Sequence, residues 1–307
     1  MSYAFVFPGQ GSQSIGMLAD LAESHAQVQE VFAEASDALG YDLWDVVQND
    51  AEGKLNQTDV TQPAMLASGI AVYRTLTSLK EVSPAFMAGH SLGEYTALVA
   101  SGAMSLAQGV SLVALRGQLM QSAVPAGQGA MAAVLGLEDA QVVAVCEQAE
   151  GIVEAVNFNS PGQVVIAGNK EAVEAAMVLA TDAGASRVVP LPVSVPSHCS
   201  LMKPAAEQLA ETLNTMDIAM PSVPVLHNVD FAQAQSPEEI KERLVQQLYR
   251  PVQWVKTVNA MKEQGVEGLY ELGPGKVLMG LNRRIDRKMG MQAVFDNATL
   301  EKALASL

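Results

Sequence analysis

Apolar and polar positions along the first third of the chain predict strands that alternate with helices. Residues 3–7 form a short apolar run typical of a buried strand, and they end in a turn rich in proline and glycine at 8–12. Residues 84–88 predict a second buried strand. Helical spacing of apolar residues predicts helices over 18–39, 64–79, 92–100 and 106–123. Such alternation indicates a parallel sheet that is covered by helices on both faces.

The pattern changes after residue 125, where a proline and two glycines mark a boundary. The predicted order becomes strand, helix, strand, strand, helix, strand, which is the ferredoxin-like arrangement. The strands are expected at 131–135, 152–158, 163–167 and 187–191, and the helices at 137–149 and 171–183. We therefore expect an α+β small domain at 126–195.

The remaining segment returns to the first pattern. It predicts helices over 200–213, 237–248 and 252–264, and strands over 223–228 and 266–272. The fold class is therefore expected to be α/β, with a large domain formed by 1–125 and 196–307 and the small domain inserted into it.

Composition narrows the functional classes. The 307 residues carry a net charge of −15, which argues against nucleic acid and against an anionic membrane surface as partners. Two cysteines cannot build a disulfide framework, and the N-terminus lacks the features of a signal peptide. No apolar run has the length of a membrane span, and no metal-binding spacing of histidine or cysteine occurs. We expect a cytoplasmic protein that binds no metal.

Gly89-His90-Ser91-Leu92-Gly93 fits the pattern Gly-x-Ser-x-Gly between a predicted strand and a predicted helix. A serine on so tight a turn exposes its hydroxyl at a helix N-terminus, which favours negative charge nearby. The alternative is a glycine-rich turn that only joins strand to helix. The context favours a nucleophile at Ser91.

A serine nucleophile needs a base. Among the four histidines, His198 lies where the chain leaves the small domain and begins a helix, and a loop between domains often presents its side chains into a cleft. The alternative is a histidine that belongs only to a helix-capping region. Either Asp230 or a neutral group, such as a backbone carbonyl or a side-chain amide, could orient the imidazole. The residues alone leave that choice open.

An oxyanion hole needs two converging main-chain N–H groups. The N–H of Leu92, next after the nucleophile, is one candidate, and the loop that contains Gln10 offers the second. A dinucleotide-binding loop is excluded there because Ser14 stands where the third glycine is needed.

Arg116 lies among apolar residues of a predicted helix. A guanidinium on an apolar face must be paired or must reach solvent. If an internal Asp or Glu pairs it, Arg116 is structural. If it is free, it can bind a substrate carboxylate through two hydrogen bonds.

Six motifs, in order along nearly the whole chain, resemble the malonyl-CoA:acyl carrier protein transacylases of bacterial fatty-acid synthesis. They are Phe7-Pro8-Gly9-Gln10-Gly11-Ser12-Gln13, the serine turn extended to Glu94-Tyr95, Arg116-Gly117, Asn157-Phe158-Asn159-Ser160-Pro161-Gly162-Gln163, Val195-Pro196-Ser197-His198 and Glu271-Leu272-Gly273-Pro274-Gly275. The resemblance implies a hydrolase-like large domain with an inserted ferredoxin-like small domain.

The resemblance also implies functional roles. It makes Ser91 the nucleophile, His198 its base, Gln10 and Leu92 the oxyanion hole, and Arg116 the clamp on a malonyl carboxylate. It implies a Ser-His dyad without a carboxylate, in which a backbone carbonyl and the amide position Gln247 take the place suggested for Asp230. The implied substrates are malonyl-CoA, a coenzyme A thioester, and holo acyl carrier protein. No bound cofactor is implied.

The implied carrier protein is acidic, so a chain of net charge −15 needs a local basic patch to bind it. We expect that patch in the segment that carries Lys276, Arg283, Arg284, Arg287 and Lys288. The alternative is an ordinary solvated helix face.

Three other functions remain compatible with the same residues. A serine hydrolase or thioesterase would turn over the thioester with water, and a scaffold would bind the carrier without catalysis. A transferase for another extender unit, such as methylmalonyl, would keep the chemistry. Arg116 and the absence of an acidic triad member count against the hydrolase.

Overall fold

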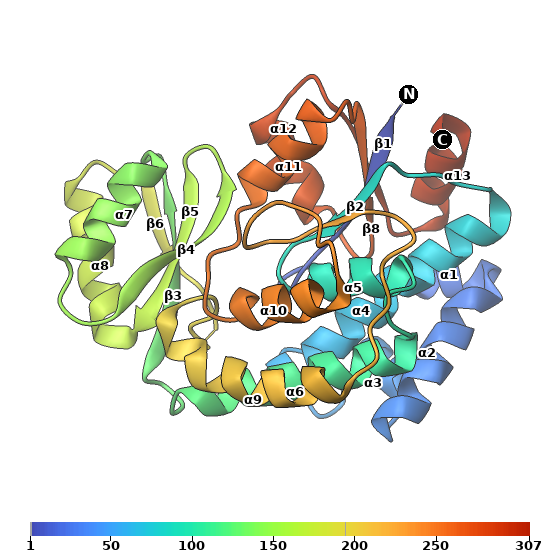
Figure 1. Cartoon of the computed structure of the whole chain (residues 1–307), viewed down its shortest axis with the longest axis horizontal. Coiled ribbons are helices and arrows are strands. Elements are labelled where there is room, and N and C mark those ends of the chain that lie inside the picture. Colours follow the sequence, from blue (N-terminus) through green and yellow to red (C-terminus); the bar gives the residue numbers. More distant parts are fainter. Residues whose placement is uncertain (1, 194) are drawn as a thin grey trace.

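The computed structural model describes residues 2–193 and 195–307. Met1 and Ser194, which fall in the predicted large and small domains, lie outside the described residues. Two sheets organise the chain: one has five strands and the other has four. The smaller sheet and its two helices lie to one side of the rest of the molecule (Figure 1).

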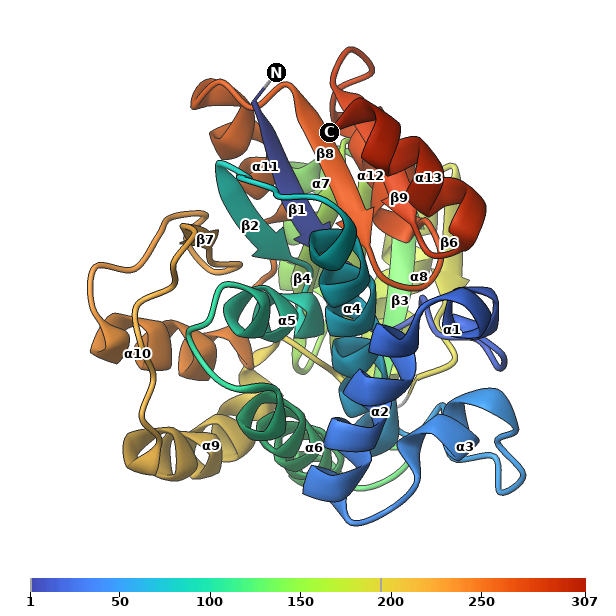
Figure 2. The ribbon, with the colours of Figure 1, turned by 90° about the vertical axis from the view of Figure 1, so that its right-hand side faces the viewer.

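The larger sheet is parallel throughout and has the order β7-β2-β1-β8-β9. Strands β2, β1, β8 and β9 are seen side by side in Figure 2. The strands of this sheet are β1 (Tyr3–Phe7), β2 (Phe86–Gly89), β7 (Val225–Leu226), β8 (Gly268–Leu272) and β9 (Gly290–Val294). Because the strands are parallel, the loops that follow β1, β2 and β7 meet at one edge of the sheet.

Helices connect these strands and cover both faces of the sheet. They are α1 (Ala19–Ser24), α2 (Ala26–Leu39), α3 (Leu43–Gln48), α4 (Thr58–Leu79), α5 (Leu92–Ala100), α6 (Leu106–Ala123), α9 (Lys203–Thr215), α10 (Pro237–Gln247), α11 (Trp254–Glu263), α12 (Val277–Ile285) and α13 (Asn297–Ser306), with a single 3₁₀ turn η1 (Ser200–Met202) before α9.

Successive residues of β1 belong to two different cores, as the alternation of side chains along a strand requires. Phe5 and Phe7 join the cluster that includes α2, α4, α5 and α6. Ala4 and Val6 join a second cluster, against Trp254 of α11 and residues of α12. The expectation of a parallel sheet that is covered on both faces is confirmed.

The smaller sheet is antiparallel and has the order β4-β5-β3-β6. Its elements are β3 (Gly129–Leu135), α7 (Asp139–Gln148), β4 (Val153–Ser160), β5 (Gln163–Asn169), α8 (Lys170–Asp182) and β6 (Arg187–Pro190). Both the element order and the strand order are those of a ferredoxin-like unit, and a core of its own lies between its sheet and its helices. All six elements fall inside the predicted small domain 126–195, and the domain boundaries themselves stay a prediction.

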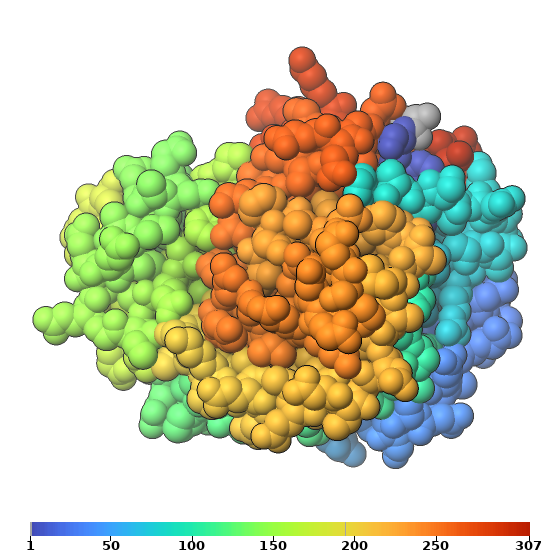
Figure 3. Space-filling model, in the orientation of Figure 1, coloured from blue at the N-terminus to red at the C-terminus, as the bar shows by residue number. Residues whose placement is uncertain are grey.

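Hydrogen bonds tie the small sheet to the rest of the chain. The N–H of Val252 donates to the carbonyl oxygen of Val156 at 2.9 Å, and the carbonyl oxygen of Val252 accepts the N–H of Phe158 at 3.0 Å. Strand β4 therefore forms one isolated bridge with the segment before α11. In the space-filling view the small unit forms a distinct lobe beside the chain segments that follow residue 200 (Figure 3).

Several predicted element limits are wrong. The predicted helix over 18–39 is two helices, α1 and α2, separated at the extended residue His25. Helix α4 begins at Thr58, six residues before the predicted start, and contains Pro63. The predicted strand over 223–228 pairs only at Val225 and Leu226. The strand β9 and the helix α13 were not predicted.

Candidate active site

Ser91 occupies a sharp turn between β2 and α5. Its φ and ψ are 51° and −110°, a strained conformation for a residue with a side chain. The turn is possible because Gly89 and Gly93 lack a Cβ. A Cβ on Gly89 would lie 1.9 Å from the carbonyl of Gly93, and one on Gly93 would lie 2.1 Å from the carbonyl oxygen of Phe7.

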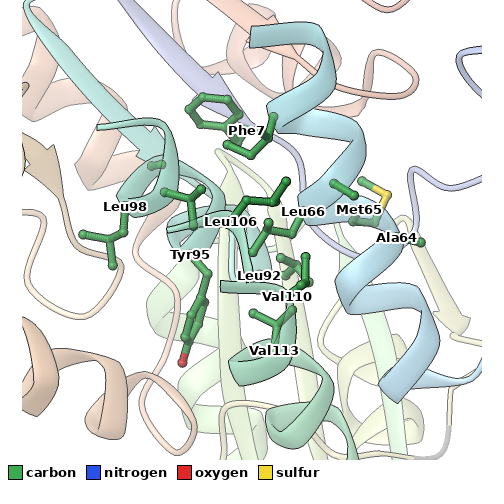
Figure 4. Close-up of a cluster of buried hydrophobic side chains, with 14 of the residues drawn as sticks. Phe7, Ala64, Met65, Leu66, Leu92, Tyr95, Leu98, Leu106, Val110 and Val113 are labelled. Atoms are coloured by element: carbon green, nitrogen blue, oxygen red, sulfur yellow. The ribbon is translucent and has the colours of Figure 1, made fainter. Parts of the chain in front are cut away.

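The helix behind the serine is rigidly packed. In Figure 4, Leu92 of α5 lies among Leu66 of α4 and Val110 of α6, and all three belong to one buried cluster. A side-chain contact also fixes the turn, since the main-chain N–H of Ser91 donates to Oδ1 of Asn228 at 2.6 Å. The nucleophile candidate is therefore held by backbone geometry rather than by its own side chain.

His198 lies beside Ser91. Its Nε2 is 2.8 Å from the Ser91 Oγ, and its Nδ1 is 2.7 Å from the main-chain carbonyl oxygen of Gln247. A carbonyl can only accept, so Nδ1 carries the proton and Nε2 is free to accept the serine proton. His198 has a φ of 67°, and its N–H donates to the carbonyl of Leu248 at 3.0 Å, which fixes the loop.

Burial, together with the positive charge of Arg116, lowers the pKa of His198 to about 3, from an ordinary value of 6.5. The hydrogen bond from Nδ1 to the Gln247 carbonyl acts in the opposite direction. The imidazole is therefore neutral at physiological pH, as a general base must be.

Arg116 projects from α6 toward the same two residues and is only 1% exposed. It donates from Nη1 to Oε1 of Gln62 at 2.8 Å and from Nη2 to Oε1 of Gln247 at 3.0 Å, and Nη2 lies 3.4 Å from the Ser91 Oγ. Its guanidinium carbon lies 5.3 Å from the ring centroid of Tyr95.

Among the residues that the structure describes, no Asp or Glu forms an ion pair with Arg116, and its Nε has no acceptor. The alternative of a structural ion pair is contradicted. The guanidinium is held by two neutral amides and keeps an unmatched positive charge, which suits an anionic ligand.

Ser91, His198 and Arg116 line one cavity of about 500 Å³. Gln10 and Leu92 line it too, so both predicted oxyanion donors lie at the same cavity as the serine. Met131, Asn157 and Leu191 complete it from the small unit, so the cavity lies between the two sheets. Such a cleft can exclude water from a reacting centre.

Gln247 does more than the sequence indicated. Its main-chain carbonyl binds His198, while its side-chain amide binds Arg116, the carbonyl of Ser91 and the carboxyl group of Glu94. Three other contacts were missed from sequence, those of Gln62, Asn228 and Glu94. The available signal was a polar side chain in or next to a segment predicted to be an apolar helix or strand.

Asp230 binds Arg243 rather than His198. Its carboxylate binds Nε of Arg243 at 2.7 Å, whereas the Nδ1 of His198 is taken by the Gln247 carbonyl. Asp230 as the orienting residue is therefore wrong.

The predicted basic segment is exposed at all five of its cationic positions. Lys276 precedes α12, Arg283 and Arg284 lie in its last turn, and Arg287 and Lys288 follow it. Nη1 of Arg284 donates to Oε1 of Gln163 at 2.7 Å, so this segment reaches β5 of the small unit.

Residues 2–193 and 195–307 contain neither a membrane-spanning helix nor a metal-binding cluster. No helix there is long and apolar enough to cross a bilayer. No group of three or more His, Cys, Asp or Glu side chains there could hold a metal ion.

Comparison with known proteins gives consistent matches. The acyl transferase domain model matches residues 4–292. The malonyl CoA-acyl carrier protein transacylase of Escherichia coli K12 is 55% identical over 304 residues, 98% of each chain. That of Bacillus subtilis 168 is 45% identical over 310 residues, which cover 99% of this chain and 96% of the relative.

Two solved structures extend the likeness to three dimensions. An acyl carrier protein S-malonyltransferase from Vibrio cholerae has a TM-score of 0.96 at 55% identity, covering 99% of this chain and 100% of its own. A malonyl-transacylase in complex with a type II PKS acyl-carrier protein has a TM-score of 0.99 at 52% identity, with full coverage of both chains.

Proposed function

The chain belongs to the acyl transferase family and transfers a malonyl group from malonyl-CoA to acyl carrier protein, and we propose that the transfer runs through a covalent malonyl-Ser91 intermediate. The observation that carries this proposal is the 2.8 Å contact between the Ser91 Oγ and a neutral His198 Nε2, beside an arginine without a carboxylate partner. That set contains a nucleophile, a base and a receptor for a substrate carboxylate.

In the first half-reaction, Oγ of Ser91 attacks the thioester carbonyl carbon while its proton passes to Nε2 of His198. The N–H groups of Gln10 and Leu92 stabilise the tetrahedral oxyanion. The carbon–sulfur bond then breaks, and the departing sulfur of coenzyme A takes the proton from His198. The products are free coenzyme A and the malonyl ester of Ser91.

The second half-reaction reverses these steps with a different thiol. The phosphopantetheine thiol of holo acyl carrier protein gives its proton to His198 and attacks the ester carbonyl. The carbon–oxygen bond breaks, and Oγ of Ser91 takes the proton back. No electron transfer occurs and the chain supplies every group, so we propose that no bound cofactor is needed.

Arg116 provides selection for malonyl. A malonyl carboxylate can bind the guanidinium with two charge-assisted hydrogen bonds, whereas an acetyl group leaves the buried cation without an anion. The 3.4 Å between Arg116 Nη2 and the Ser91 Oγ supports a carboxylate site only a few bonds from the reacting carbonyl.

The carrier protein is proposed to dock on the basic segment, with Arg283 and Arg284 as its central residues. The segment is exposed, and Arg284 reaches the small unit, so a partner bound there would lie over the boundary between the two sheets. Electrostatic attraction to an acidic partner would act against the overall charge of −15.

We also propose domain boundaries and a location. The large domain consists of 1–125 and 196–307, and the small domain of 126–195, since the two sheets have separate cores. A cytoplasmic location is supported by Cys146 and Cys199, which are both unpaired, as is usual in a reducing compartment.

The test is transfer itself. The protein is mixed with malonyl-CoA and either holo or apo acyl carrier protein, and the carrier mass is recorded. Malonylation of the holo carrier alone is the expected result, because only the holo form carries the thiol. Free malonate accumulating at the same rate without any carrier would instead identify a hydrolase.

A further inference from the structure

Glu94 is a buried acid that none of the reaction steps uses. It lies in the first turn of α5, three residues after the nucleophile, and is 0% exposed. Burying a carboxyl group is costly unless its oxygens are fully hydrogen-bonded. Its contacts therefore show what this acid is for.

Both oxygens of Glu94 face N–H donors. Oε1 lies 2.7 Å from Nδ1 of His227, and Oε2 accepts the main-chain N–H of Asn228 at 2.9 Å and Nε2 of Gln247 at 2.8 Å. The last of these contacts reaches the residue that holds both His198 and Arg116.

The side-chain amide of Gln247 must have a fixed orientation for Arg116 to be held. Its Nε2 faces two acceptors, the carbonyl oxygen of Ser91 at 3.0 Å and Oε2 of Glu94. That leaves Oε1 toward Arg116, at 3.0 Å from Nη2. A flipped amide would place its NH₂ against the guanidinium, which has no lone pair to accept it.

We propose that Glu94 is the positioning residue of the carboxylate clamp: it fixes the amide of Gln247 and thereby holds Arg116 toward the acyl group. The proposal rests on the proposed function, because it assigns Glu94 a part in malonyl selection. Glu94 touches neither substrate nor reacting atoms and acts only through Gln247.

The nucleophile and the base also have contacts that do not involve Glu94. His198 binds the main-chain carbonyl of Gln247, which keeps its place whichever way the amide points. The side chain of Asn228 is fixed by Ser91 N and by the carbonyl of Gly89, both at 2.6 Å. Loss of Glu94 should therefore weaken the clamp more than it weakens nucleophile and base.

Two substitutions distinguish the effect of the acid itself from the effect of the hydrogen bonds that it accepts. In Glu94→Gln, the amide oxygen can still accept from Asn228 and Gln247, while its NH₂ can donate to Nδ1 of His227 after the imidazole proton moves to Nε2. In Glu94→Ala, all three contacts are lost. Glu271→Gln is the matched control, because Glu271 is a buried acid that binds Leu278 and Met279 on α12 instead.

The measurement is the single-turnover rate of Ser91 acylation by malonyl-CoA and, separately, by acetyl-CoA. We expect Glu94→Ala to slow malonyl loading by about tenfold or more and acetyl loading by less than about threefold, as loss of a hydrogen bond to a charged group implies. Glu94→Gln and Glu271→Gln should keep the ratio of the two rates within about threefold of the original. Equal slowing of both substrates by Glu94→Ala would overturn the proposal.

A double-mutant cycle tests whether Glu94 acts through Arg116. In an Arg116→Ala background, Glu94→Ala should change malonyl loading by less than about twofold. If the two substitutions instead slow malonyl loading by independent factors that multiply, Glu94 does not act through Arg116, and the proposal is contradicted.

Two further measurements keep the outcomes distinct. If Glu94→Ala does not fold, Glu94→Asp is measured in its place. The aspartate side chain is one carbon shorter, so its carboxyl group lies farther from Gln247. An unchanged ratio of malonyl to acetyl loading in Glu94→Asp would then count against the proposal. Failure of the unaltered protein to acylate Ser91 would refute the proposed function itself, whatever the variants do.

Discussion

At the scale of single residues, the site depends on side chains that are distant in sequence and converge on one serine. Ser91 and His198 are separated by 107 positions and meet at 2.8 Å. Arg116 reaches the same hydroxyl from another helix. What distinguishes this site from a general acyl-transfer site is the buried cation, so selectivity should respond to Arg116 before anything else does.

Replacement of Arg116 by alanine should therefore change substrate preference. The loss of charge-assisted hydrogen bonds to the malonyl carboxylate should cost about 2–3 kcal/mol, or roughly 30- to 150-fold in kcat/KM for malonyl-CoA. Acetyl-CoA, which has no carboxylate, should lose far less. Steady-state kinetics with both thioesters measure this, and Arg74→Ala, at a surface ion pair, is the control. An unchanged malonyl-to-acetyl preference would show that Arg116 is not the clamp.

The pH dependence of acylation follows from the lowered pKa of His198. With a pKa of about 3 rather than 6.5, the base stays unprotonated well into the acid range. The acylation rate at pH 5.5 should therefore lie within about twofold of the rate at pH 7.5. A rapid-quench pH profile of malonyl loading measures it, and a tenfold fall for each pH unit below about 6.5 would indicate an ordinary imidazole.

The same shift has a consequence for stability. Between pH 6.5 and about 3 the unfolded chain binds a proton at residue 198 that the folded protein excludes. The contribution of this residue to the free energy of unfolding therefore falls as the pH falls through that window.

At the residue scale, the sequence singled out residues that the structure brings together where they belong to a local motif. Ser91 and its glycines are contiguous, and His198 follows a proline-rich exit from the small unit. Gln62, Asn228 and Glu94 could not be assigned because their roles come from contacts between distant segments. For example, Asn228 binds Ser91 across 137 positions.

At the scale of elements, the turn between β2 and α5 is the most constrained feature. Gly93→Ala should be strongly destabilising, since its Cβ would meet the Phe7 carbonyl oxygen at 2.1 Å. We expect a loss of about 3 kcal/mol or more in the free energy of unfolding, at the upper end of overpacking costs. Urea unfolding measures this.

Gly280→Ala is the control for that substitution. A Cβ there meets nothing within 4 Å, and the residue lies on the exposed side of α12, so alanine should be neutral or stabilise by up to about 1 kcal/mol. Equal effects of the two substitutions would contradict the steric explanation of the turn.

Element prediction was most reliable where periodicity and turn chemistry agree. The strand over 3–7 and the antiparallel pair β4–β5 around its Pro161-Gly162 turn were predicted within a few residues. Helix α4 was cut short at Pro63, although tertiary packing carries the helix through it. Strand β7 is shorter than the strand predicted over 223–228, because only Val225 and Leu226 pair with β2.

At the scale of the whole molecule, charge distribution should govern partner binding. Reversal of Arg283 and Arg284 to glutamate should raise the KM for holo acyl carrier protein by about tenfold or more at low salt, since close charge pairs steer and hold partners. Acylation by malonyl-CoA should not change. Measuring both half-reactions separately tests this, with Lys302→Glu on α13 as a control outside the basic segment. Equal effects on both half-reactions would exclude a docking role.

The layered architecture could be predicted from sequence, because the change from alternating strands and helices to the ferredoxin-like order is visible in the chain itself. The sequence indicated a cleft where the two units join, but neither the bridge between β4 and Val252 nor the full set of residues that line the cavity. The cavity is thus enclosed by two units whose relative placement only the structure provides.

The most direct test is the intact mass of the protein after brief mixing with malonyl-CoA, beside a Ser91→Ala variant. A mass gain of one malonyl group that maps to Ser91, is absent from the variant and is discharged by holo acyl carrier protein is the predicted result. Transfer to the carrier without any such adduct, or with the Ser91→Ala variant fully active, would contradict a covalent intermediate on this serine.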